Sequence, residues 1–269
     1  DSYENWIQKK LVHDSKMDDA KFKKEIGDTV INKCIEALGR IRAGIQLLVE
    51  DDISFDAFCF MNRSMILQRN IMNFSKKHGA GIECAFRDFV DPRNPSNNFG
   101  WRPFQIAFIL MNLKGIVDPE HDNREVVDLL YFPTGGGKTE AYLGLMAFVI
   151  ANRRLRTNES DEYNRDGGVT AILRYTLRLL TTQQRDRITK MILAAELIRQ
   201  KEYPKYGKEP ISIGFWVGGT VTPNTFKELE EDPEDPAKTR TARSKKNSIY
   251  KQLLTCPFCG KPLTEENFY

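Results

Sequence analysis

The 269-residue sequence has no apolar run close to the ~20 residues that a membrane-spanning helix requires. Its longest apolar run, residues 143–151, contains a glycine and is better explained as a buried helix. The beginning of the sequence is polar and acidic, and it has no signal-peptide pattern. These absences, with a hydrophobic fraction of 41% and a charged fraction of 29%, predict a globular protein of the cytoplasm.

The sequence also has few cysteines and a small net charge. The five cysteines are an odd number, and Cys34, Cys59 and Cys84 are isolated from one another. This pattern suits a reducing compartment rather than a disulfide framework. The net charge of +3 permits nucleic-acid binding but does not argue for it. No internal repeat is evident, and no strand pattern precedes about residue 125.

The first 90 residues are predicted to form a helical domain. Apolar residues recur every three or four positions over residues 20–50, and a second helical pattern covers residues 53–76. A segment rich in proline and asparagine, residues 91–100, is predicted to be a linker.

After the linker the pattern alternates between strands and helices. Strands are expected at 126–132, 169–175 and 211–217, and helices at 103–113, 138–155 and 179–202. Such alternation predicts parallel β-α-β units, and therefore an α/β domain over residues 101–225. Residues 226–269 are predicted to be a charged insertion, with an acidic run followed by basic residues 238–251 that would track a phosphate backbone or form a solvated loop.

Residues 126–139 carry the strongest functional signal. A β-branched apolar run ends in Pro-Thr-Gly-Gly-Gly-Lys-Thr, and a helix-forming stretch follows at once. This is the order of a phosphate-binding loop, although Phe132 occupies the first glycine position of the strict pattern. A glycine-rich turn that binds nothing is the alternative.

The residue types in this loop suit a nucleoside triphosphate and Mg²⁺. Glycines let successive backbone N–H groups turn toward a phosphate, and the following helix N-terminus adds a positive dipole end. Lys138 would reach the β- and γ-phosphates, and the Thr139 hydroxyl would bind Mg²⁺. The predicted nucleotide-binding residues of the loop are Thr134, Gly135, Gly136, Gly137, Lys138 and Thr139, and the last two are the predicted catalytic residues.

Two further polar groups flank the loop in sequence. Upstream, Arg102 and Gln105 would read the adenine of ATP, or would simply begin a surface helix. Downstream, a polar group at the end of a predicted strand and a glycine pair at the end of the next one would contact a nucleic-acid backbone, or would form a capped helix start and a tight turn. The predicted contact residues are Thr176, Arg178, Gln183, Gly218 and Gly219.

Together these motifs resemble the first motor domain of superfamily 2 helicases over residues 100–220, with Tyr175 departing from the usual proline. The amino-acid sequence of these motifs is most similar to that of the large helicase subunit of DISARM-type bacterial anti-phage systems. This resemblance implies a RecA-like parallel sheet with a phosphate loop, incomplete in this chain. It also implies ATP-driven action on DNA and a partner subunit with a DUF1998 domain.

The carboxylate pair that would activate the attacking water is missing after residue 139. Residues 47–52 look similar but continue a helical stripe. The second motor domain is missing too, so the chain is expected to be part of a longer protein and to hydrolyse essentially no ATP alone. The alternatives are a restriction-type translocating ATPase that does not unwind DNA, and a non-enzymatic module stabilised by nucleotide.

Cys256-Pro-Phe-Cys259-Gly has the spacing of half a zinc ribbon. Two thiolates on a knuckle turn supply two of the four tetrahedral ligands that Zn²⁺ requires. The other pair is expected beyond Tyr269.

Overall fold

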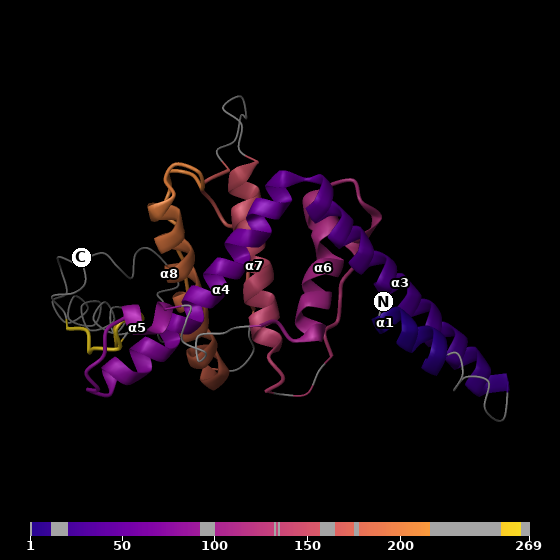
Figure 1. Ribbon diagram of the computed structural model, residues 1–269, viewed down its shortest axis with the longest axis horizontal. Helices are drawn as coiled ribbons and strands as arrows, with labels where there is room; N and C mark the ends of the chain where they lie inside the picture. Colours follow the sequence, from indigo (N-terminus) through magenta and orange to yellow (C-terminus); the bar gives the residue numbers. More distant parts are fainter. Residues whose placement is uncertain are drawn as a thin grey trace, which may run out of the picture. The chain divides into compact units, whose positions relative to one another are not determined.

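The computed structural model describes residues 2–11, 21–91, 100–131, 133, 135–156, 165–174, 178–215 and 254–264. The elements, shown in Figure 1, are α1 (Ser2–Trp6), η1 (Ile7–Leu11), α3 (Lys21–Glu50), α4 (Asp52–Gly79), α5 (Arg87–Val90), α6 (Pro103–Val117), η3 (Asp122–Glu125), α7 (Lys138–Leu155) and α8 (Arg178–Lys201). They belong to two units. Unit 1 comprises residues 1–65, 99–173 and 203–209, and unit 2 comprises residues 66–98, 174–202 and 210–269.

The predicted RecA-like parallel sheet is wrong for the part of the chain that the structure describes. Those residues contain helices but no strand or sheet, apart from one isolated antiparallel bridge between Thr255 and Pro262. In the first predicted strand the alternate side chains of Val127, Leu129 and Tyr131 are 94%, 88% and 90% exposed. A β-branched pattern reports only a local preference, whereas a strand exists through pairing with a second segment.

The five long helices expected from periodicity are confirmed. They are α3, α4, α6, α7 and α8, and their ends fall within a few residues of the predicted ones. Helical periodicity is a local signal, so it predicts a helix without regard to the rest of the chain. A strand prediction depends in addition on pairing with a distant segment. None of the helices in the described ranges is long and apolar enough to cross a membrane.

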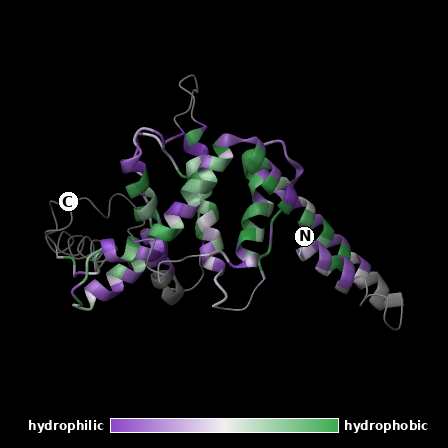
Figure 2. Cartoon of the chain, in the orientation of Figure 1, coloured by the Kyte–Doolittle hydropathy of each residue, from purple (hydrophilic) through white to green (hydrophobic). Residues whose placement is uncertain are grey.

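In unit 1, helix α6 packs against both α3 and α7. Figure 2 shows α6 as hydrophobic along most of its length, and Ile109 and Leu113 are fully buried. A Cβ at Gly44 of α3 would lie 1.9 Å from the carbonyl oxygen of Leu110. Glycine is therefore required where α3 meets the α6 backbone. On α7, Phe148 is fully buried as well.

Ion pairs attach the connecting segments of unit 1 to its helices. Arg40 donates to both carboxylate oxygens of Asp128, at 2.7 and 2.6 Å, and holds the extended segment 126–131 against α3. This bidentate bond raises the pKa of Arg40. Burial raises the pKa of Asp51, but hydrogen bonds from Ser54 and Arg156 outweigh burial and hold that pKa below its ordinary value.

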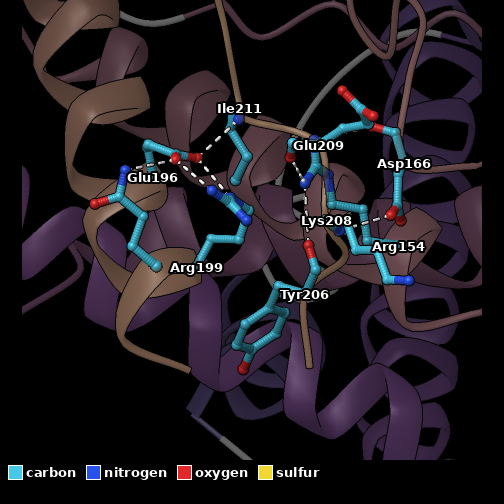
Figure 3. Close-up of polar contacts among 9 residues, drawn as sticks. Arg154, Asp166, Glu196, Arg199, Tyr206, Lys208, Glu209 and Ile211 are labelled. Carbon is cyan, nitrogen blue, oxygen red and sulfur yellow. Dashed lines mark hydrogen bonds and ion pairs between the residues drawn. The ribbon is translucent and has the colours of Figure 1, made fainter. Parts of the chain in front are cut away.

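Near the C-terminal end of α7, a buried arginine binds two loops by hydrogen bonds. The Arg154 guanidinium donates to the carbonyl oxygens of Asp166, Tyr206 and Glu209, at 2.8, 3.0 and 2.6 Å (Figure 3). The Asp166 carboxylate accepts from the backbone N–H of Lys208 at 2.8 Å. Two loops that are distant in sequence are thus joined through one side chain.

In unit 2, α8 packs through small and apolar side chains, including the fully buried Met191, Ala194 and Ala195. The buried Gln68 amide donates to the carbonyl oxygen of Arg187 at 3.1 Å. Glu196 accepts from Arg199 and from the N–H of Ile211 (Figure 3). Burial raises the pKa of Glu196, but these bonds hold it below its ordinary value.

Candidate functional site

The glycine loop before α7 has a left-handed backbone at two of its glycines. Gly135 and Gly137 adopt φ values of +81° and +93°, a region that side chains other than glycine rarely enter. The N–H of Gly136 donates to the carbonyl oxygen of Pro133 at 3.1 Å and closes a tight turn. Gly137 is the N-cap of α7, so the loop delivers the chain directly into the helix.

The first turn of α7 contains Lys138 and Thr139, both half-buried. The first N–H groups of a helix have no acceptor within the helix, and its dipole favours an anion at this end. Left-handed glycines next to a helix N-terminus make a concave set of backbone donors. The residues present therefore fit a phosphate group. Thr134 lies outside the described residues.

Arg102 and Gln105 at the start of α6 contact this loop. Arg102 donates to the carbonyl oxygen of Gly136 at 2.7 Å, and Gln105 donates to that of Gly137 at 2.7 Å. The Gln105 carbonyl oxygen also accepts from the backbone N–H of Arg102 at 2.8 Å. The two elements, about 30 residues apart in the chain, form one site.

Trp101 fixes this arrangement and was not predicted from the sequence. Its indole N–H donates to the amide oxygen of Asn62 on α4 at 2.7 Å. A Cβ at Gly144 of α7 would lie 2.6 Å from the Trp101 ring. The sequence contained one signal, a tryptophan next to the Arg-Pro-Phe-Gln group, but its partners lie far from it in the chain.

The predicted nucleic-acid contacts are not brought together by the described residues. Thr176, Gly218 and Gly219 lie outside them, as do basic residues 238–251. Arg178 and Gln183 lie in the first turns of α8, and the structure does not describe their side chains. The DNA-binding residues stay a prediction.

Cys256 and Cys259 occupy a tight hairpin in unit 2. The N–H of Gly260 donates to the carbonyl oxygen of Cys256 at 2.8 Å, and the N–H of Cys256 donates to that of Lys261 at 2.8 Å. Both thiols are free and half-buried. Within the described ranges, no group of three or more potential ligands exists to hold a metal ion. The hairpin therefore offers two ligands.

The hairpin is docked on the end of α4 by contacts that the sequence did not reveal. The ring nitrogen Nδ1 of His78 lies 2.8 Å from the carbonyl oxygen of Cys259. A Cβ at Gly260, where φ is +73°, would lie 2.2 Å from the carbonyl oxygen of Ser75. The Phe258 ring packs against Phe74 and Phe86, with centroids 5.5 and 4.9 Å apart. The fold thus holds the two cysteines in place.

Comparison with known proteins finds similarity to part of a DISARM protein. No protein-family model matches it. The chain is 45% identical over 269 residues to the DISARM protein DrmA of Bacillus paralicheniformis, an alignment that includes 99% of this chain and 23% of that protein. The chain thus spans about a quarter of the length of this relative. The similarity supports a DrmA-like protein.

Proposed function

We propose that this chain forms the nucleoside-triphosphate-binding part of a DISARM component that uses ATP and Mg²⁺ to translocate along DNA or unwind it in bacterial anti-phage defence. The observation that carries the proposal is the glycine loop. Two left-handed glycines lead into α7, Lys138 and Thr139 lie in its first turn, and side chains from α6 hold the loop.

The residues of the loop take distinct roles in this proposal. The backbone of Thr134 and of residues 135–137 would surround the phosphates, and Lys138 would offset their charge. The Thr139 hydroxyl would hold Mg²⁺, which, when bound, neutralises charge on the phosphate oxygens.

The motor activity itself rests on the resemblance to superfamily 2 helicases and on the DISARM relative. Because the chain spans 23% of that relative, action on DNA belongs to the whole protein in this proposal. Thr176, Arg178, Gln183, Gly218 and Gly219 would contact the DNA backbone. A subunit with a DUF1998 domain would be the protein partner.

Binding of a fluorescent ATP analogue to the 269-residue chain tests the first step. We expect displacement by excess ATP, and a chain that binds no nucleoside triphosphate would remove the proposal. Strand-displacement assays on the whole protein then separate unwinding from translocation alone. Phage protection that persists after Lys138→Ala would instead favour a non-enzymatic module that nucleotide only stabilises.

We also propose that the hairpin of Cys256 and Cys259 is half of a structural zinc site, with two ligands from outside the described residues. A knuckle turn with two thiols in a pre-docked hairpin supports this assignment. Zn²⁺, when bound, would cross-link the hairpin to the segment that supplies the other ligands.

Cys256→Ser is expected to abolish stoichiometric zinc in the whole protein, because a serine hydroxyl does not replace a thiolate ligand. Zinc per protein after dialysis against a chelator is the measurement. Cys84→Ser is the control, because Cys84 is another half-buried thiol of unit 2. This variant should leave the zinc content unchanged. Equal zinc in the wild type and the Cys256 variant would contradict the proposal.

A further inference from the structure

An arginine of α3 anchors the segment that leads into the glycine loop. Arg40 donates to both carboxylate oxygens of Asp128 at 2.7 and 2.6 Å, and its side chain is only 9% exposed. Two such bonds fix the relative orientation of the two groups as well as their distance. The remaining guanidinium donor, Nε, is buried and has no hydrogen-bond partner among the described residues. The hydrogen bonds of this buried charge therefore depend on Asp128.

The anchored segment, residues 126–131, is mostly exposed and leads into the glycine loop. Three of its side chains are almost fully exposed, whereas that of Asp128 is half-buried. Within the described ranges, Arg40 makes the side-chain hydrogen bonds that this segment receives. Only six residues separate Asp128 from Gly135, the first glycine of the loop. Because so short a stretch has a limited reach, the position of Asp128 limits where the loop can lie.

Helix α3 is a firm base for this anchor, because it packs closely on α6 (Figure 1). Gly44 lies one turn after Arg40, and a Cβ there would lie 1.9 Å from the carbonyl oxygen of Leu110. Residues four apart lie on one face of a helix, so Arg40 and Gly44 share a face of α3. At the start of α6, Arg102 holds the carbonyl oxygen of Gly136. The loop is thus held through α6 directly and through α3 on its upstream side.

We infer that Arg40 is a positioning residue of the nucleotide site: through Asp128 it holds the chain that enters the glycine loop, and so it couples α3 to nucleotide binding. This inference rests on the proposed nucleotide binding at the loop. Coupling of this kind is reciprocal, so bound nucleotide strengthens the Arg40–Asp128 pair by as much as the pair strengthens nucleotide binding. The long helix α3 then responds to the nucleotide state of the loop.

Arg40→Met is expected to lower the affinities for ATP and ADP together, by about 10-fold, because nucleotide binding must then also order the entering segment. Arg40 acts on the loop rather than on one phosphate, so the ratio of the two affinities should stay as in the wild type. In the nucleotide-free chain, the amides of residues 127–131 and 135–137 should exchange hydrogen faster than in the wild type.

The double variant Arg40→Met/Asp128→Asn tests whether the two residues act as a pair. Asp128→Asn alone leaves the Arg40 charge buried without its partner, whereas the double variant removes both charges and should fold at least as well as either single variant. We expect nucleotide affinity to fall no further in the double variant than in Arg40→Met, because the effects of paired residues do not add. Losses that add would contradict the inference, since each residue would then act alone.

Arg156→Met is a matched control. Arg156 forms an ion pair with Asp51, another part-buried pair of unit 1 whose residues are far apart in sequence. It is the C-cap of α7, at the opposite end of that helix from the glycine loop. This variant removes the same charge and should leave both nucleotide affinities, and exchange at residues 135–137, unchanged. An equal fall in affinity in Arg40→Met and Arg156→Met would overturn the inference, because it would reflect general destabilisation of the unit.

A fall in ATP affinity with ADP affinity unchanged would also overturn the inference, because it would place the effect of Arg40 at the γ-phosphate and not on the entering segment. If the wild-type chain binds no nucleotide, the proposed function fails, and exchange at residues 135–137 alone decides whether Arg40 holds the loop. Unchanged exchange there in Arg40→Met would overturn the inference in either case.

Discussion

Lys138→Ala is expected to lower the affinity of the chain for ATP about 100-fold, through loss of charge-assisted hydrogen bonds to two phosphates. The fold should be intact, because Lys138 is a half-buried residue in the first turn of α7 rather than part of the apolar core. Competition against a fluorescent ATP analogue measures the affinity. ADP should lose less than ATP, since it lacks the γ-phosphate.

Lys114→Ala is the matched control for charge. Lys114 lies in the same unit, in the last turn of α6, and pairs with Asp118 at 3.7 Å. Removing it changes the net charge of the chain as much as Lys138→Ala does, but not the charge at the loop. An unchanged ATP affinity in Lys138→Ala, or an equal fall in both variants, would contradict the proposed role of the loop.

The helices were predictable because their signal is local. Apolar residues three and four positions apart on α3 and α4 predict an amphipathic helix whatever the rest of the chain does. The predicted sheet depended instead on pairing between segments distant in sequence. Residues 126–131 show the difference. Their apolar, β-branched run predicted a strand, yet in the structure the segment is anchored by Asp128 to Arg40 of α3 and exposes Val127, Leu129 and Tyr131.

The candidate site was predictable in its residues but not in its contacts. Three consecutive glycines before Lys-Thr predicted a glycine loop that leads into a helix, and α7 begins at Lys138 directly after Gly137. The left-handed φ values of Gly135 and Gly137 are a finding of the structure. The proximity of Arg102 and Gln105 to the loop was expected from the helicase resemblance. Their bonds to loop carbonyls were not, because the direction of a side-chain amide depends on its burial and on neighbours such as Trp101.

Arg154→Met is expected to destabilise the chain by about 3 kcal/mol or more, because three carbonyl oxygens lose a buried charged donor. Methionine fills much of the space but donates no hydrogen bond. The loops at residues 165–168 and 203–209 would keep the Asp166 bond to Lys208, the Lys205–Asp56 ion pair at 2.8 Å, and the packing of Tyr206 on Phe60, with ring centroids 4.5 Å apart. Urea unfolding followed by circular dichroism measures the change.

Arg153→Met provides the comparison, because it removes a guanidinium from the adjacent position of the same helix. Arg153 donates to the carbonyl oxygen of Val169 at 3.2 Å and to the Thr170 hydroxyl at 3.0 Å, but it is half-buried. Water can replace these hydrogen bonds, so Arg153→Met should lower the free energy of unfolding by about 1 kcal/mol or less. Equal losses of unfolding free energy in the two variants would mean that burial of the Arg154 guanidinium does not make its hydrogen bonds more stabilising. The expected difference would show that unit 1 depends on the Arg154 hydrogen bonds at this end of α7, at the opposite end from the glycine loop.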